Sequence, residues 1–292
     1  MPQLNNHLPS KRSQYPELMS GLTRFSGTDR VGHLRNLCRT DLFFLLRYGL
    51  GRKDAEFDFV FDRCREVQAS PNGHLDLWAR EHFKSSIITC ALTIQDILND
   101  PEITIGIFSH TRKIAKSFLR QIKREFENNE NLKELFPEIL WADPEKQSPK
   151  WSEDEGLIVK RKQNPIPATV EAWGIMDGMP TGRHFRLCVY DDVVTETSVT
   201  TADAIRKTTQ AWELSLSLGM DVGEKKGITR YIGTRYAFSD CYQTIIERQV
   251  ATPRIYPITL DGTVEGEPVL LTREDVAEIR RSRGPYTFAC QY

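Results

Sequence analysis

Apolar residues in this sequence follow two kinds of pattern, short strand-like runs and longer stretches with helical spacing. The strand-like runs are near-continuously apolar or alternate, as buried strands of a parallel sheet do. We predict strands at residues 75–79, 103–109, 157–160, 169–172, 187–190 and 227–233, and a short one after residue 252. We predict helices at residues 31–48, 56–68, 85–98, 111–128, 200–218, 240–249 and 273–281.

Because strands alternate with helices, the pattern indicates an α/β fold with a mainly parallel central sheet flanked by helices. The first 30 residues are polar and rich in turn formers, so we expect a loose arm there. We divide the chain into an N-terminal arm and helix (1–55), a core (56–251) and a small C-terminal lid or linker (252–292).

Composition excludes several classes of protein. The chain has 292 residues, a formal net charge of −1 and six scattered cysteines without a C-x-x-C pair. We interpret the cysteines as reduced core residues, because a disulfide framework or zinc site needs closer spacing. No apolar run is long enough to span a membrane, and the N-terminus lacks the apolar stretch of a signal peptide.

Only a local patch could bind nucleic acid, since the overall charge is near zero. The predicted helix 111–128 carries Arg112, Lys116, Arg120 and Lys123 on one face. We interpret this face as a solvated basic surface, with contact to DNA as the alternative.

The chemistry of the chain is organised around residues 74–86. An alternating strand pattern is followed by a short loop, then by Lys84 and Ser85, and then directly by a helical pattern. This is the layout of a phosphate-binding P-loop, in which a helix N-terminus, a lysine and a Mg²⁺-binding hydroxyl meet a nucleotide. In the usual pattern G-x-x-x-x-G-K-[ST], Trp78 and Phe83 stand at the glycine positions. The alternative is a buried strand that runs into an ordinary helix with an exposed lysine.

Two further strands end in polar residues. Asp191 and Asp192 follow the strand at 187–190, and Thr234 and Arg235 follow Gly233. Ligands of parallel sheets gather at the carboxyl ends of the strands, so these residues can join Lys84 in one site. One carboxylate can hold Mg²⁺ and the next can orient or deprotonate a water. A solvated turn and a polar strand end are the alternatives.

Together these segments resemble the ATPase domain of a tailed-bacteriophage large terminase subunit, the motor that pumps DNA into a procapsid. The matching segments are residues 79–85, 105–123, 169–175, 178–185, 187–192, 232–240 and 284–292. The resemblance covers about residues 55–292, and the order and spacing of the motifs carry it. It implies a P-loop NTPase of the additional-strand, RecA-like type that uses ATP and Mg²⁺.

The resemblance and the P-loop chemistry assign roles to particular residues. Lys84 would neutralise the terminal phosphates, Ser85 and Asp191 would hold Mg²⁺, and Asp192 would position or activate the water. The nucleotide-binding segment would comprise Arg80, Glu81, His82, Phe83, Lys84, Ser85 and Ser86.

Three arginines and Thr234 receive further roles. Arg80 resembles the family's loop arginine, which acts near the γ-phosphate, and Thr234 and Arg235 would couple hydrolysis to movement. Arg183 enters the 187–190 strand from the edge opposite the phosphates, so we interpret it as a finger for a neighbouring subunit. The alternatives are that Arg183 satisfies turn carbonyls or a carboxylate, or that Arg206 or Arg235 supplies the finger.

Two positions depart from the family pattern. Phe83 replaces the second P-loop glycine, and we expect the loop to take a wider path there with a negative φ. The aspartate strand ends Asp-Asp where many relatives have Asp-Glu, so the carboxylate of Asp192 is one methylene shorter.

The resemblance also implies partners: double-stranded DNA, the portal protein, the small terminase subunit and a homo-oligomeric ring, expected to be a pentamer. We expect work in the host cytoplasm, transiently on the procapsid, with no membrane and no place in the virion. The family's nuclease domain normally follows a segment like residues 284–292, so we expect no DNA cleavage by this chain. The rival functions are another helicase-like translocase and a catalytically silent P-loop docking module.

Overall fold

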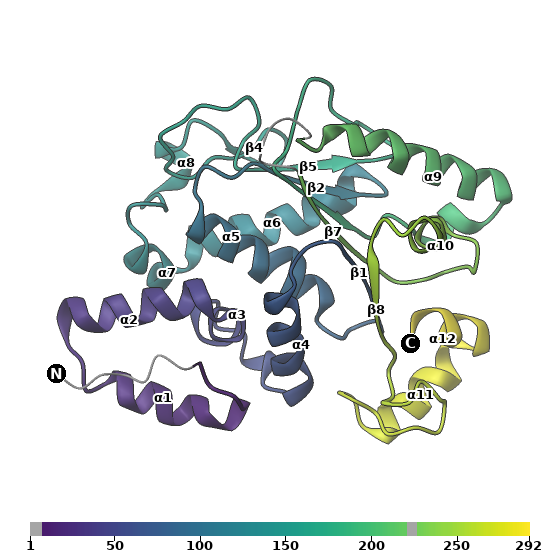
Figure 1. The fold of residues 1–292 in the computed structure, drawn as a ribbon, viewed down its shortest axis with the longest axis horizontal. Coiled ribbons are helices and arrows are strands. Elements are labelled where there is room, and N and C mark those ends of the chain that lie inside the picture. Colours follow the sequence, from purple (N-terminus) through teal and green to yellow (C-terminus); the bar gives the residue numbers. More distant parts are fainter. Residues whose placement is uncertain (1–7, 221–226) are drawn as a thin grey trace.

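The computed structural model describes residues 8–220 and 227–292, and its centre is one mixed β-sheet flanked by helices (Figure 1). The fold is therefore α/β, as the alternating pattern predicts. The strands are β1 (His74–Trp78), β2 (Ile105–Ser109), β3 (Trp151–Ser152), β4 (Gly156–Leu157), β5 (Val170–Gly174), β6 (Leu187–Asp191), β7 (Ile228–Gly233) and β8 (Thr252–Tyr256).

The spatial order of the strands is β3-β4-β5-β2-β6-β7-β1-β8. The six neighbouring strands β5, β2, β6, β7, β1 and β8 run parallel to one another. Among the described strands only the pairings made by the short β3 and β4 are antiparallel. The register pairs Leu77 of β1 with Gly233 of β7, and Asp191 of β6 with Ile232 of β7. The carboxyl ends of β1, β7 and β6 therefore lie at one edge, with β7 between the other two.

Helices cover both faces of the sheet (Figure 1). They are α1 (Tyr15–Leu22), α2 (Gly27–Thr40), α3 (Leu42–Phe44), α4 (Asp58–Ala69), α5 (Thr93–Asn99), α6 (Arg112–Asn128), α7 (Glu130–Leu135), α8 (Pro144–Gln147), α9 (Ala202–Ser215), α10 (Cys241–Glu247), α11 (Arg273–Arg283) and α12 (Pro285–Gln291). A π-helical segment, Ser85–Leu92, runs directly into α5; we call residues 85–99 the loop helix. Its buried side chains and those of α6 belong to one hydrophobic cluster, and Trp212 of α9 and Tyr242 of α10 belong to a second cluster.

The last strand extends the sheet beyond the expected core boundary at residue 251. β8 pairs along its whole length with β1, and Asp76 of β1 lies opposite Arg254 of β8. The two side chains form a buried bidentate ion pair, with Nε to Oδ1 at 2.8 Å and Nη2 to Oδ2 at 2.7 Å. This pair ties β8 to the strand that leads into the candidate site.

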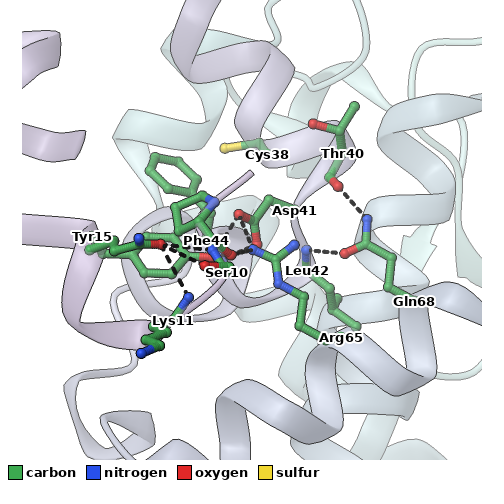
Figure 2. A network of polar contacts seen from close by, with 12 residues as sticks. Ser10, Lys11, Tyr15, Cys38, Thr40, Asp41, Leu42, Phe44, Arg65 and Gln68 are labelled. Carbon is green, nitrogen blue, oxygen red and sulfur yellow. Dashed lines mark hydrogen bonds and ion pairs between the residues drawn. The ribbon is translucent and has the colours of Figure 1, made fainter. Parts of the chain in front are cut away.

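The expectation of a loose arm over the first 30 residues is wrong for its described part, residues 8–30; residues 1–7 lie outside the described chain. Helix α1 lies here, and α2 begins at Gly27. Tyr15, which starts α1, is fully buried, and its hydroxyl donates to Asp41 Oδ2 at 2.7 Å (Figure 2). Arg65 of α4 donates to the same oxygen at 3.1 Å. Tyr15 and Leu22, both buried in the main hydrophobic cluster, thus dock α1 onto the rest of the chain.

The basic face of α6 forms ion pairs, and Arg120 on it is exposed, in keeping with the interpretation of a solvated surface. Arg120 binds Glu153 through two bonds of 2.6 Å, and Lys116 contacts Asp154. Both acidic residues lie in the turn between β3 and β4. The paired carboxylates neutralise much of the charge that a DNA contact would require.

The remaining expectations from composition concern cysteines and membranes. The six cysteines are reduced thiols, and five of them are buried, which confirms the interpretation as core residues for these five; Cys290 is partly exposed. None of the helices in the described ranges has the length and apolar character needed to cross a bilayer.

Replacing Asp41 by alanine tests the docking of the N-terminal helices. Asp41 is fully buried, accepts from Tyr15 and Arg65, and caps α3 by accepting from the backbone N–H of Phe44 at 3.0 Å. We expect Asp41→Ala to lower the free energy of unfolding by about 2–4 kcal/mol in urea denaturation, because it removes a cap and takes away the buried acceptor of the Tyr15 hydroxyl. The control Asp62→Ala, at an exposed position of α4, should stay within about 0.5 kcal/mol of the parent. Equal effects of the two substitutions would contradict the docking.

Candidate functional site

The loop between β1 and the loop helix, residues 79–84, has an unusual backbone. Glu81 and Phe83 adopt positive φ values of 66° and 62°, although neither is glycine. The expectation of a negative φ at Phe83 is therefore wrong. The loop keeps a left-handed conformation at the second glycine position of the P-loop pattern, at a cost of about 1–3 kcal/mol per residue.

Packing explains why a phenylalanine is held in that conformation. Its ring is partly buried against the main hydrophobic cluster, and the guanidinium of Arg52 lies 5.7 Å from the ring centre. The next residue, Lys84, is right-handed, with φ −51° and ψ −53°. Consecutive left- and right-handed residues form a concave array of backbone N–H groups that binds anions.

His82 anchors the middle of the loop. Its side chain is fully buried, Nδ1 lies 2.8 Å from the carbonyl oxygen of Arg80, and its ring packs edge-on against Phe59 of α4 at 5.5 Å. Burial and the nearby Lys84 lower the pKa of His82, so the ring is neutral and Nδ1 is the donor. The histidine therefore packs the loop against α4.

Lys84 is buried, unlike the exposed lysine of the alternative interpretation. Only 8% of the residue is exposed. Burial lowers the pKa of Lys84, while the carboxylates of Asp192 and Asp191 act in the opposite direction. The structure therefore brings together the lysine and both aspartates that the sequence selected.

Asp191 ends β6 and is fully buried. Its Oδ2 accepts a hydrogen bond of 2.5 Å from the hydroxyl of Thr89, on the loop helix. Oδ1 has no hydrogen-bond partner of normal geometry among the described residues, and the Ser85 hydroxyl lies close enough to favour the charged form. Burial first, and then the neighbouring charge of Asp192, raise the pKa of Asp191.

Asp192 also has a left-handed backbone, with φ 51°. Its N–H donates to the carbonyl of Ile232 at 3.2 Å, and its own carbonyl accepts from the N–H of His110 at 3.1 Å. Burial raises the pKa of Asp192, while Lys84 and Arg80 oppose that shift. Asp192 is thus fixed between the ends of β7 and β2 and faces the charges of the loop.

The end of β7 lies close to α10. A Cβ on Gly233 would meet the hydroxyl of Tyr242 at 2.0 Å, so glycine is required there. That hydroxyl also contacts the carbonyl of Ile232 at 3.3 Å and the N–H of Val194 at 3.4 Å. Tyr242 therefore joins the segment after Asp192 to the end of β7.

The two residues after Gly233 differ in their surroundings. Thr234 is buried, whereas Arg235 is directed to its own loop and donates to the carbonyl of Phe238 at 2.7 Å and to Gln243 Oε1 at 3.0 Å. Arg235 thus shapes the turn that leads into α10.

Arg80 connects the loop to the C-terminal helix α12. Its N–H donates to the carbonyl of Gln291 at 2.8 Å, and its guanidinium donates to Gln291 Oε1 at 3.1 Å. The hydroxyl of Tyr286, also in α12, donates to the carbonyl of Tyr236 at 2.6 Å. A cavity of about 180 Å³ lies between the ends of β1, β7 and β8 and this helix. Helix α12 therefore contacts both the loop and the turn after β7.

Arg183 and Ser86 lie outside the centre of the site. Arg183 precedes β6, at the opposite edge of the sheet from Asp191. There Nε lies 3.1 Å from Glu171 Oε2, and Nη1 donates to the carbonyl of Ile166 at 3.1 Å. A carboxylate and a turn carbonyl thus occupy Arg183, as its alternative interpretation supposed. Ser86 Oγ lies 3.5 Å from Arg52 Nη1.

Sequence reasoning missed three residues that organise the site: Thr89, Tyr242 and Gln291. Thr89 could have been found, because it follows Ser85 by four residues on the same helix and so faces the same strand. Tyr242 and Gln291 gave no local signal, since their partners lie far away in the sequence.

The donor set suits Mg²⁺ bound together with phosphates. Among the described residues no group of three or more His, Cys, Asp and Glu side chains could hold a metal alone. Mg²⁺ commonly uses one or two protein oxygens, substrate phosphates and waters. The unpartnered Oδ1 of Asp191 and the hydroxyl of Ser85 match that pattern.

Comparison with known proteins adds no family: neither protein-family models nor curated proteins give a match to this chain. The chemistry of the site therefore has to be argued from its geometry. A concave backbone, a buried lysine, the buried Asp191 and the half-buried Asp192 can together bind a phosphate–metal complex and act on a water beside it.

Glycine and alanine at position 83 test the strained loop. In ordinary backbone glycine is less stable than alanine by about 0.5–1 kcal/mol, but a left-handed position reverses that order. We expect Phe83→Gly to be more stable than Phe83→Ala by about 1 kcal/mol in urea denaturation, since both lose the same ring. The control pair, Ser117→Gly and Ser117→Ala in the middle of α6, should show the ordinary order. Alanine more stable than glycine at position 83 would refute the left-handed loop.

Asparagine at position 191 tests the cost of the buried carboxylate. The folded pKa of Asp191 is raised above its ordinary value of 3.8. Folding therefore favours the protonated form, and stability falls as the pH rises from about 3.8 through the folded pKa. We expect Asp191→Asn to stabilise the nucleotide-free protein at pH 8 by roughly 1 kcal/mol or more, and by less at pH 4.5.

Urea denaturation at the two pH values measures this difference. Asp62→Asn, at an exposed site on α4, is the control and should have little effect at either pH. A destabilised Asp191→Asn protein at pH 8 would contradict the pKa direction.

Proposed function

We propose that this chain is the ATP-hydrolysing motor domain of a tailed-phage large terminase, which drives double-stranded DNA into a procapsid. The observation that carries the ATPase part is the meeting of the left-handed 79–84 loop, the buried Lys84 and the Asp191–Asp192 pair at one edge of the sheet. Strain and buried charge of this kind concentrate at functional sites.

The strand order supports a P-loop NTPase of the additional-strand, RecA-like type. The loop follows β1, the aspartates follow β6, and β7 lies between these two strands. An additional strand between the phosphate-loop strand and the aspartate strand is the feature that gives this class its name. The ends of β1 and β6 are therefore separated by the width of β7, which leaves room for phosphates at the carboxyl end of β7.

The residues present fit ATP and Mg²⁺. Lys84 would neutralise charge on the terminal phosphates, while Ser85 and Asp191 would hold the metal. Bound Mg²⁺ supplies charge stabilisation to the transferring phosphoryl group. Asp192 would position the water and accept its proton, for which a raised pKa brings the carboxylate closer to the working pH.

The coupling and packaging roles rest on the resemblance in motif order. Arg80 would act near the γ-phosphate, and Thr234 and Arg235 would pass the nucleotide state on to the turn before α10. Their contacts favour this: Arg80 binds α12, and the turn that Arg235 shapes binds the same helix. A change at the phosphates can thus reach α12 by two routes.

Translocation would require a ring of subunits around DNA, which we propose to be a pentamer on the portal with the small terminase subunit, in the host cytoplasm. In such a ring Arg183 would have to leave Glu171 to serve a neighbouring site. The paired face of α6 is a poor candidate for the DNA contact.

A catalytically silent docking module is disfavoured by the energetics. Burial raises the pKa of both Asp191 and Asp192, so the nucleotide-free fold is penalised for carrying their charges. A purely structural domain would be more stable with neutral side chains there.

Loss of Lys84 tests the ATPase proposal. We expect Lys84→Ala to reduce steady-state ATP turnover by at least about 10²-fold, because phosphate charge is left uncompensated. Far-UV circular dichroism should show an intact fold. The control Lys146→Ala, on the exposed helix α8, should leave turnover unchanged. Undiminished hydrolysis by Lys84→Ala would end the P-loop assignment.

Asp192→Asn separates binding from chemistry. We expect it to keep affinity for Mg-ATP and to lose turnover by about 10²–10⁴-fold, because a general base acts only in the chemical step. Equilibrium binding of a fluorescent ATP analogue and a phosphate-release assay measure the two effects. Normal turnover would place the water-activating group elsewhere, with Glu196 the next candidate.

A further inference from the structure

The loop helix places a threonine hydroxyl on the candidate metal ligand. Thr89 Oγ1 donates to Asp191 Oδ2 at 2.5 Å, and both residues are buried, at 1% and 0% exposed. The other oxygen, Oδ1, is buried without a partner of normal geometry in the described chain. The two oxygens of the Asp191 carboxyl group therefore differ: Oδ2 accepts the Thr89 hydroxyl, and Oδ1 does not.

We propose that Thr89 is a positioning residue that holds the carboxyl group of Asp191 with Oδ1 presented to Mg²⁺. This inference rests on the proposed ATPase function, and it names a residue outside the loop and the two aspartates. Thr89 itself touches neither metal nor nucleotide; it acts through Asp191.

The physical need arises from the freedom of the carboxyl group. Rotation of an aspartate about its last bond is broad and roughly two-fold, so the torsion itself does not fix the plane of the carboxyl group. Mg²⁺ demands near-ideal octahedral geometry and tolerates little error in its ligands. Partners that orient a ligand are typically worth 10–100-fold in metal affinity.

A merely structural bond would have a different signature. If the Thr89 hydroxyl only satisfied a buried acceptor, its loss would lower stability and leave the Mg²⁺ dependence of nucleotide binding unchanged. A positioning role instead changes the Mg²⁺ requirement and leaves metal-free binding as it is.

The loop helix supplies its own matched control. Thr93 follows Thr89 by four residues, is fully buried, and its hydroxyl has no hydrogen-bond partner among the described residues. Thr93→Val makes the same chemical change in the same helix without touching Asp191.

The experiment measures equilibrium binding of a fluorescent ATP analogue across a Mg²⁺ series and in EDTA. We expect Thr89→Val to raise the Mg²⁺ concentration for half-maximal binding by about 10-fold or more, with binding in EDTA unchanged. Thr89→Ser, which keeps the hydroxyl, should lie close to the parent, and Thr93→Val should match it.

The other possible outcomes separate the proposed function from the role of Thr89. A parent protein that shows no Mg²⁺-dependent binding overturns the proposed function and the inference with it. A parent that binds normally, with Thr89→Val at the same Mg²⁺ midpoint, overturns the inference alone. An equal loss of affinity in EDTA also overturns it, because the effect would then not act through the metal. If Thr89→Val does not fold, Thr89→Cys takes its place with the same expectations, since a thiol is a weak donor.

Discussion

The left-handed backbone at Glu81 and Phe83 is the constraint on which the candidate site depends. These two residues curl the chain so that the helix begins directly after Lys84 and its N-terminal N–H groups stay available. Glycine would adopt this conformation without strain, so the fold has to hold it by packing. His82, buried against α4, and the ring of Phe83, packed on the main core, supply that anchorage. These contacts hold the loop in its curved conformation without a ligand, and such preorganisation reduces the entropic cost of binding.

A second cost is electrostatic. Lys84 and Asp191 are buried and Asp192 is half-buried beside them. Desolvation lowers the pKa of Lys84 and raises the pKa of each aspartate, so it favours the neutral form of all three side chains. A bound phosphate–metal group would pair the lysine with anionic oxygens and the carboxylates with a cation, which would remove most of the penalty. Without a ligand the charges of the site are therefore poorly compensated, and the site is well suited to a ligand that carries both positive and negative charge.

Sequence patterns predicted the elements that bear the site, and failed where distant contacts decide. The strand before Asp191 was found because buried parallel strands are continuously apolar, and the strand before Lys84 because its apolar residues alternate. The backbone of Phe83 was wrongly predicted, because the expectation considered only the strain of a positive φ. It omitted the packing of the Phe83 ring, which offsets that strain. The helix at Tyr15 was missed because it is short, and its packing on Asp41 and α4 depends on residues that are distant in the sequence. The periodicity of apolar residues indicates which local segments are buried. It does not identify contact partners that are distant in the sequence.

The most direct measurement of the central claim is a structure of the protein with Mg²⁺ and a non-hydrolysable ATP analogue. We expect terminal phosphates against the N–H groups of the 79–84 loop and Lys84, and a single metal between Ser85 and Asp191. Asp192 should face the γ-phosphate through a water. A nucleotide bound elsewhere, or a loop that releases Phe83 from its left-handed backbone while phosphates bind away from Lys84, would contradict it.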